Sequence, residues 1–106
     1  MVRWAKQEKK RFQAKVLTIV KKIPKGRLMT YKVIAKKLHS SPRAVAKALS
    51  MNPHPTKMPC FRVVLSNGKI GGYNRGKKKK AELLRKEGAV IKKGKILNFA
   101  KKAIFN

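Results

Sequence analysis

Thirty lysine and arginine side chains are expected to lie mostly outside whatever core this chain builds, and only three glutamates and no aspartate offset their charge. The resulting formal net charge of +27 repels other cations and the chain itself. Hydrophobic residues still make up 42% of the sequence, in stretches that alternate with the basic ones, which is enough for a core and argues against disorder. We expect residues 1–106 to form a single domain around one modest core.

This charge favours a polyanionic partner. Nucleic acid is the first candidate, because lysines spread over a folded surface release counterions from phosphates. An anionic membrane surface is the second, but no apolar run approaches the roughly 18 residues of a spanning helix and no signal peptide opens the chain. A lone cysteine forms no disulfide within the chain, which suits a reducing compartment. We expect an intracellular protein located with DNA, in the cytoplasm or nucleoid, or in the nucleus of a eukaryote.

The first half of the chain carries three predicted helices. Apolar residues recur at helical spacing from position 12 to position 23, before a proline and a glycine end the helix. Thr30 can cap a second helix over "YKVIAKKL". Ser41 followed by Pro42 supplies an N-cap and a first helical position, which predicts a third helix from about Pro42 to Ser50.

The third predicted helix has two different faces. Val45 and Leu49 can pack into a core, whereas Arg43, Lys47 and Ser50, at spacing i, i+4 and i+7, share a basic polar face. Two short helices of this kind predict a helix-turn-helix, although bundles of short helices produce the same pattern by chance.

The second half predicts a small β component. Three prolines make "NPHPTKMP" a stiff loop, and "FRVVL" and "KIGGY" flank the turn "SNG", which predicts a hairpin. Residues 77–87 predict a helix that Gly88 ends, and the apolar residues of the tail predict a small wing or a closing strand. The expected fold is mostly α with a small β part.

Cys60 follows the proline-rich loop directly. A buried free cysteine is usually an inert hydrophobe. Against that reading, the loop fixes the backbone, the positive surroundings favour the thiolate, and Arg62 would lie on the same side of an extended strand. The residues alone leave both a core side chain and a nucleophile open.

The stretch "NPHPTKMPCFRVV", followed by "SNGKIGGYNRG" and "LLRKEG", resembles the active-site region of the O6-alkylguanine-DNA alkyltransferases, the methylated-DNA–protein-cysteine methyltransferases. The resemblance extends back through "GRLMTYKVIAKKL" and "SPRAVAKAL" and covers nearly all of residues 12–91. It implies a winged helix-turn-helix-like catalytic domain without the family's additional N-terminal domain, a format shared with the alkyltransferase-like proteins.

The resemblance implies a single-turnover repair reaction without cofactor or metal. The Cys60 thiolate would take the alkyl group from O6 of a guanine rotated out of double-stranded DNA. The recognition helix would enter the minor groove, with Arg43 filling the gap in the base stack, and the protein would act as a monomer. Tyr31 would assist departure of the guanine, and Glu87 would end a proton relay.

The resemblance and the basic surface together indicate a wider set of contacts to DNA. Asn52 would brace the active-site turn, Pro55 would pack against the extruded base, and the carbonyls of Cys60 and Val63 would accept hydrogen bonds from its amine. The full set expected to contact DNA is Arg43, Lys47, Ser50, Asn52, Pro55, Arg62, Val63, Gly71, Tyr73, Asn74, Arg75 and Lys80.

The loop expected to close over the pocket contains Gly71, Tyr73 and Asn74. Arg75 stands where the family prefers glycine, and it would either bind a phosphate or narrow the mouth of the pocket. Lys80 matches a family lysine near the pocket, but in a run of four lysines it is interpreted more readily as solvated charge.

Phe61 departs from the family, which has a histidine there to take the thiol proton. Phenylalanine neither accepts nor donates a proton, so the relay is broken and Glu87 is expected to lose its partner. The thiolate could form anyway, His54 could substitute, or transfer could be lost. We favour a slow but working alkyl acceptor, with a non-catalytic sensor of alkylated DNA as the alternative and a generic basic helix-turn-helix protein as the third reading.

Overall fold

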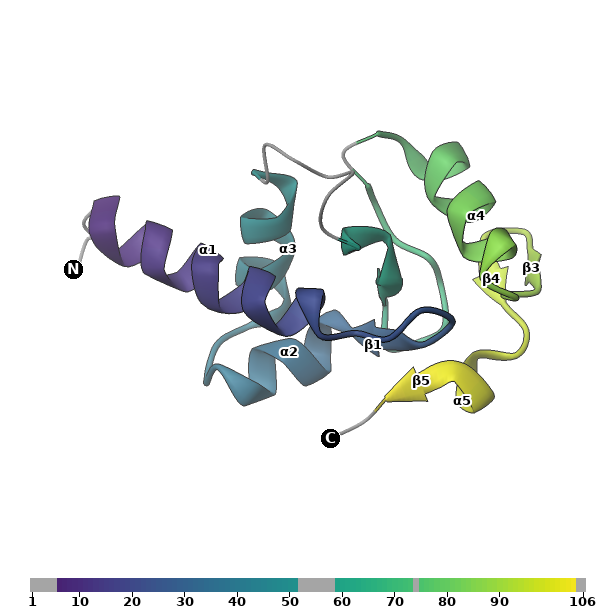
Figure 1. Cartoon of the computed structure of the whole chain (residues 1–106), viewed down its shortest axis with the longest axis horizontal. Coiled ribbons are helices and arrows are strands. Elements are labelled where there is room, and N and C mark those ends of the chain that lie inside the picture. Colours follow the sequence, from purple (N-terminus) through teal and green to yellow (C-terminus); the bar gives the residue numbers. More distant parts are fainter. Residues whose placement is uncertain (1–5, 52–58, 74, 105–106) are drawn as a thin grey trace.

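The computed structural model describes residues 6–51, 59–73 and 75–104, and it begins with three helices around one short strand (Figure 1). In chain order the elements are α1 (Lys6–Lys21), β1 (Leu28–Thr30), α2 (Tyr31–Lys37), α3 (Pro42–Ser50), the 3₁₀ helix η1 (Cys60–Arg62), β2 (Val63–Val64), α4 (Lys77–Lys86), β3 (Ile91–Lys92), β4 (Lys95–Ile96), α5 (Phe99–Lys102) and β5 (Ala103–Ile104).

Side-chain caps determine where α2 and α3 begin. Thr30 Oγ1 accepts a hydrogen bond from the Val33 amide at 3.0 Å, and Ser41 Oγ accepts one from the Ala44 amide at 3.1 Å. Pro42 then occupies the first position of α3, where its missing N–H breaks no bond. The predicted second and third helices are therefore confirmed, and α2 and α3 pack against each other as a helix-turn-helix would.

The central sheet joins three segments that are far apart in the sequence. Strand β1 lies between β2 and β5 and runs parallel to both, with Met29 opposite Val63 on one side and Ile104 on the other. Side chains alternate across a strand. Met29 and Val63 therefore enter one core cluster, whereas Leu28 and Val64 enter another.

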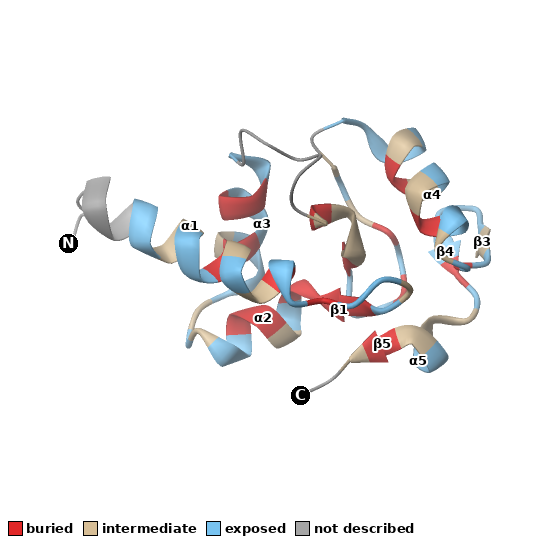
Figure 2. Ribbon diagram, in the orientation of Figure 1, coloured by how far each residue is buried: buried red, intermediate tan, exposed pale blue. Residues whose placement is uncertain are grey.

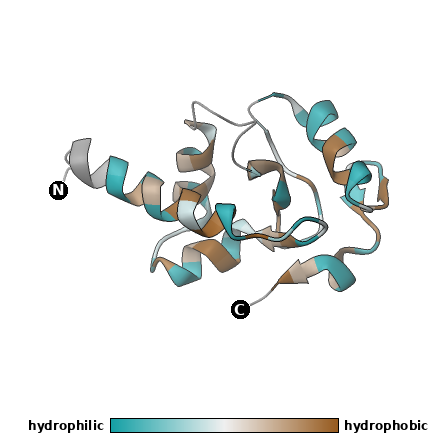
Figure 3. Cartoon of the chain, in the orientation of Figure 1, coloured by the Kyte–Doolittle hydropathy of each residue, from teal (hydrophilic) through white to brown (hydrophobic). Residues whose placement is uncertain are grey.

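Both faces of this sheet are covered, as expected for parallel strands. The first cluster fills the space between α1, α2, α3 and the sheet and includes Cys60. The second lies between the sheet, α4 and the β3–β4 hairpin. Figure 2 shows the buried residues on the inward sides of the helices, and Figure 3 shows α4 as mainly hydrophilic outside that contact.

The hairpin expected between "FRVVL" and "KIGGY" is wrong. Its first residues form η1, and β2 pairs with β1 instead. The turn itself exists, since the Leu65 amide donates to the Lys69 carbonyl at 2.9 Å, but Lys69 then pairs with Lys95 of β4. Two-residue strands carry too little alternation to reveal their partners.

The C-terminal third agrees with the sequence-based expectations. Helix α4 ends before Gly88, which has the left-handed φ of +94° that favours glycine. The tail forms the predicted small wing, with β3 and β4 antiparallel, and the closing strand β5. The fold is mostly α with a small β part, as predicted. Within the described ranges, no helix is long and apolar enough to cross a membrane.

Candidate active site around Cys60

An open cleft of about 920 Å³ lies between α3 and the loop of residues 65–73. That volume falls within the range of about 300–1,000 Å³ that is common for small-molecule sites. Its lining residues are Tyr31, Pro42, Arg43, Ala46, Leu49, Ser50, Cys60, Leu65, Gly71, Gly72, Tyr73 and Lys77. The chain thus brings its one cysteine, its two tyrosines and an arginine of α3 to one cavity.

Helix α3 divides its predicted polar face between two clefts. Arg43 and Ser50 line the cleft that contains Cys60. Lys47 instead lines a separate apolar groove of about 380 Å³, together with Phe12 of α1 and Met51. Of the three polar residues expected to point the same way, two therefore line the Cys60 cleft and Lys47 lines the neighbouring groove.

Cys60 sits at the first position of η1 rather than on a strand. The residue is 5% exposed and packs against the first core cluster, but it also lines the cleft. Because η1 is helical, Arg62 does not lie on the same side as Cys60, which corrects the expectation based on an extended strand.

Tyr31 is the first residue of α2, and its ring lies against Gly71 in the wall of the cleft. A Cβ atom added to Gly71 would lie 3.4 Å from Tyr31 Cε2 and 3.6 Å from its hydroxyl oxygen. Gly71 also has a φ of +75°, so the close approach and the backbone both favour glycine. Burial, and secondarily the charge of Cys60, raises the pKa of the Tyr31 hydroxyl, which therefore remains a proton donor.

Lys80 is fully buried, which corrects its interpretation as solvated charge. Its Nζ donates to the Val63 carbonyl at 2.7 Å and to the Gly72 carbonyl at 3.0 Å, and it lies 5.7 Å from the centroid of the Tyr31 ring. Burial lowers the pKa of Lys80 from 10.5 to about 7, although Cys60 acts in the opposite direction. Lys80 thus ties α4 to β2 and to the loop that lines the cleft.

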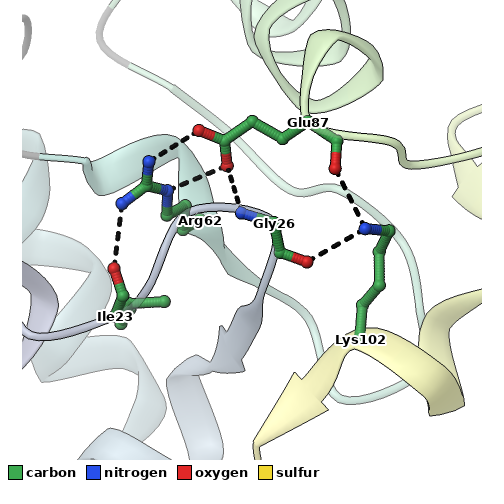
Figure 4. Close-up of polar contacts among 5 residues, drawn as sticks. All are labelled: Ile23, Gly26, Arg62, Glu87 and Lys102. Carbon is green, nitrogen blue, oxygen red and sulfur yellow. Dashed lines mark hydrogen bonds and ion pairs between the residues drawn. The ribbon is translucent and has the colours of Figure 1, made fainter.

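Glu87 has a partner, contrary to expectation, and the partner is Arg62 (Figure 4). Arg62 Nε donates to Glu87 Oε1 at 2.9 Å, and Arg62 Nη2 contacts Oε2 at 2.6 Å. Burial alone would raise the pKa of Glu87, but the hydrogen bonds from Arg62 and Gly26, with the Arg62 charge, hold it below its usual value.

The Glu87 network joins four parts of the chain. Arg62 Nη1 donates to the Ile23 carbonyl at 2.9 Å, and Lys102 Nζ bridges the carbonyls of Gly26 and Glu87 at 2.9 Å each (Figure 4). Arg62 is thereby engaged within the protein and lines neither cleft among those described. The contacts are those of a structural clamp between η1, α4, α5 and the turn after α1.

Phe61, the residue at which the sequence departs from the family it resembles, is a partly buried aromatic side chain of η1. Its ring packs beside the second core cluster, and the Arg62 guanidinium carbon lies 5.3 Å from its centroid. Arg62, which also pairs with Glu87, therefore lies over the apolar ring of Phe61.

The remaining predicted residues differ in their placement. Val63 is buried, and its carbonyl already accepts from Lys80. Arg75 is exposed and does not line the cleft. Asn52, His54, Pro55 and Asn74 lie outside the described residues.

Sequence reasoning missed several residues of the cleft wall, namely Pro42, Ala46, Leu49, Leu65, Gly72 and Lys77. Ala46 had a usable signal, because it lies three residues after Arg43 on the same face of a helix. Within the described ranges, no group of three or more histidine, cysteine or acidic residues could hold a metal ion.

Comparison with known proteins gives a consistent result. Residues 11–89 match the family model described as the DNA-binding domain of 6-O-methylguanine DNA methyltransferase. Over 80 residues the chain is 54% identical to a methylated-DNA–protein-cysteine methyltransferase of Saccharolobus islandicus and 45% identical to one of Methanothermobacter thermautotrophicus. These alignments cover 76% of this chain but only 52% and 46% of the relatives, so the chain spans about half of their length.

Solved structures show the same similarity. The O6-methylguanine-DNA methyltransferase of Pyrococcus kodakaraensis superposes with a TM-score of 0.67 at 44% identity, covering 73% of this chain and 46% of that one. An S. pombe protein solved with damaged DNA containing O6-carboxymethylguanine gives 0.79 at 28% identity, covering 90% and 95%. A Mycobacterium tuberculosis protein solved with DNA gives 0.68 at 32%, covering 82% and 51%.

Proposed function

Because this chain belongs to the family of the 6-O-methylguanine DNA methyltransferase DNA-binding domain, we propose that it repairs O6-alkylguanine in double-stranded DNA by transferring the alkyl group to Cys60. The observation that carries the proposal is that Cys60 lines an open cleft together with Tyr31 and Arg43. A merely structural cysteine would need no such opening.

The transfer is a single displacement. The Cys60 thiolate attacks the alkyl carbon, the carbon–sulfur bond forms as the bond to guanine O6 breaks, and the electron pair remains on the base. The Tyr31 hydroxyl donates the proton that guanine takes up and recovers one from water. Because a thioether is a poor leaving group, each protein molecule reacts once. The target must first leave the duplex, at a cost of a few kcal/mol.

Ionisation of Cys60 has to proceed without the family histidine. A free cysteine with a pKa of about 8.5 is already a few per cent ionised at neutral pH, and positive charge nearby increases that fraction. Lys80 is a candidate for that charge, since an ionised Cys60 raises the pKa of Lys80 and the two charges therefore attract. The expected outcome is slow transfer.

The DNA contacts follow from the same arrangement. Arg43 is exposed on α3 and lines the cleft, which supports the proposal that it occupies the gap left by the extruded base. Ser50 and Lys77 flank the same opening. In this proposal α3 lies in the minor groove, and the protein is located with DNA inside the cell.

The test is the intact mass of the protein after incubation with a duplex that contains one O6-methylguanine. Transfer adds one methyl in place of a proton, about 14 Da, and Cys60→Ala must abolish the gain. A mass that stays unchanged for the wild type while damaged DNA is bound tightly would overturn the transfer and leave the sensor.

A sensor that binds alkylated guanine without repairing it is the second candidate. Phe61 favours it, because the proton acceptor of the relay is absent. The retained cysteine opposes it, since alkyltransferase-like proteins typically replace that residue. The mass measurement decides between the two.

A further inference from the structure

The outer face of the β3–β4 hairpin carries a row of lysines. Lys92 of β3 lies opposite Lys95 of β4, and Lys95 also pairs with Lys69 on the other side. The Ile70 amide donates to the Gly94 carbonyl at 3.0 Å, and the Ile96 amide donates to the Gly68 carbonyl at 2.9 Å. These bonds make the segment around Lys69 a third strand beside the hairpin.

The two faces of this small sheet are chemically opposite. Cross-strand partners point to the same side. Ile70 and Ile96 are buried in the second core cluster, with Ile91 packed against it. The alternate residues, Lys69, Lys92 and Lys95, are all exposed.

The row is unfavourable for the free protein. Like charges directly opposite each other on neighbouring strands destabilise a sheet. Lys93 adds a fourth charge at the turn, where its φ of +51° favours asparagine, aspartate or glycine over lysine. The ion pairs found in the described ranges, Arg62–Glu87 and Lys79–Glu82, involve none of these lysines.

The row is also separate from the candidate active site. None of its lysines lines the cleft, and the hairpin lies at the end of the long axis opposite α1 (Figure 1). Residues 91–96 follow the segment 11–89 that matches the family model, whereas Lys69 lies within that segment.

We propose that the lysine row, defined as Lys69, Lys92, Lys93 and Lys95, binds the phosphate backbone of a DNA segment outside the one contacted by α3. Three adjacent strands place the row across about 10 Å, which is about three phosphate-to-phosphate intervals of about 3.4 Å along the helix axis of one strand. Phosphates between the lysines would replace repulsion with attraction, which accounts for a pattern that the free sheet disfavours.

Exposed apolar side chains adjoin the row. The Leu97 amide donates to the Val90 carbonyl at 2.7 Å, so these two residues continue the hairpin, and they are 61% and 53% exposed. By strand alternation they lie on the same face as Lys92 and Lys95. They are placed to pack against sugar rings beside the bound phosphates.

The test compares two variants of equal charge on undamaged duplexes. The row variant replaces all four lysines of the row with glutamine. The control variant replaces four other exposed lysines of α1 and α2 with glutamine, namely Lys15, Lys21, Lys36 and Lys37. The measurement uses a duplex of about 40 base pairs and plots the logarithm of the binding constant against the logarithm of the salt concentration. The negative slope of this plot should become shallower by about 2–3 for the row variant and by less than about 1 for the control. Alkyl transfer on a duplex of about 12 base pairs should be unchanged.

Two further measurements fix the interpretation. Pull-down of a second, labelled duplex by protein on an immobilised one identifies bridging, whereas loss confined to long single duplexes identifies a flanking segment of the same DNA. Relief of repulsion should also raise the melting temperature of the row variant in low salt, which reports folding independently. Equal slopes for both variants would overturn the proposal, as would loss of binding to anionic lipid vesicles with binding to DNA retained.

Discussion

Lys80 should make the stability of this protein rise with pH between neutral and alkaline conditions. Its ammonium is fully buried and its pKa is lowered from 10.5 to about 7. Between these two values the unfolded chain still holds the proton that the folded protein has released. The unfolded state therefore binds more protons, and the free energy of unfolding rises with pH across this window.

The magnitude follows from the same two values. Each pH unit inside the window contributes up to about 1.4 kcal/mol, so the free energy of unfolding should rise by up to about 4 kcal/mol between pH 7 and pH 10. Below pH 7, Lys80 is charged in both states, and its hydrogen bonds to the carbonyls of Val63 and Gly72 offset part of the cost of burial.

The measurement is urea unfolding as a function of pH for the wild-type lysine, Lys80→Met and Lys78→Met. All three carry Cys60→Ser, so that the thiol does not titrate in the same range. Lys78 is exposed and supplies the matched control. The wild-type advantage over Lys80→Met should grow with pH, whereas the advantage over Lys78→Met should stay within about 0.5 kcal/mol. A pH-independent difference for Lys80→Met would refute the reasoning.

Three other changes test the site. Phe61→His should raise the rate of alkyl transfer at neutral pH by up to about 10²-fold. If the variant is no faster than the wild type at any pH, the loss of a proton acceptor at position 61 does not limit the reaction. Arg43→Ala should weaken binding and transfer on duplex substrate about tenfold while affecting single-stranded substrate less, so equal losses on both would count against a stacking role. Glu87→Gln should lower the free energy of unfolding by about 1–3 kcal/mol, because the partly buried Arg62 side chain loses its ionised partner. The wild type should lose the same stability as pH falls through the depressed pKa of Glu87, and melting curves with an equal acid dependence in both proteins would exclude this.

The sequence predicts the elements that depend on neighbouring residues. Thr30, Ser41 and Gly88 act on backbone groups within a few positions, so α2, α3 and the end of α4 could be placed from the sequence. The parallel sheet could not, because β1, β2 and β5 are two or three residues long and pair across long separations.

The site shows the same division. Cys60, Tyr31 and Arg43 were identified and lie around one cleft. Lys80 was misjudged, although its position four residues before the buried Leu84 places both on one helix face, and that spacing was a readable signal. Arg62 was misjudged because nothing local distinguishes a 3₁₀ turn from the start of a strand.

Strand β5 has a practical consequence for how this protein is divided. It follows the matched segment 11–89, yet it supplies one neighbour of β1, at Leu28 and Met29. A fragment cut after Ala89 would keep every residue described around the cleft but would lose β5. The edge of β1 that β5 covers would then expose main-chain amides and carbonyls that can pair with another molecule. Such a fragment should aggregate at high protein concentration even though its reactive residues are intact.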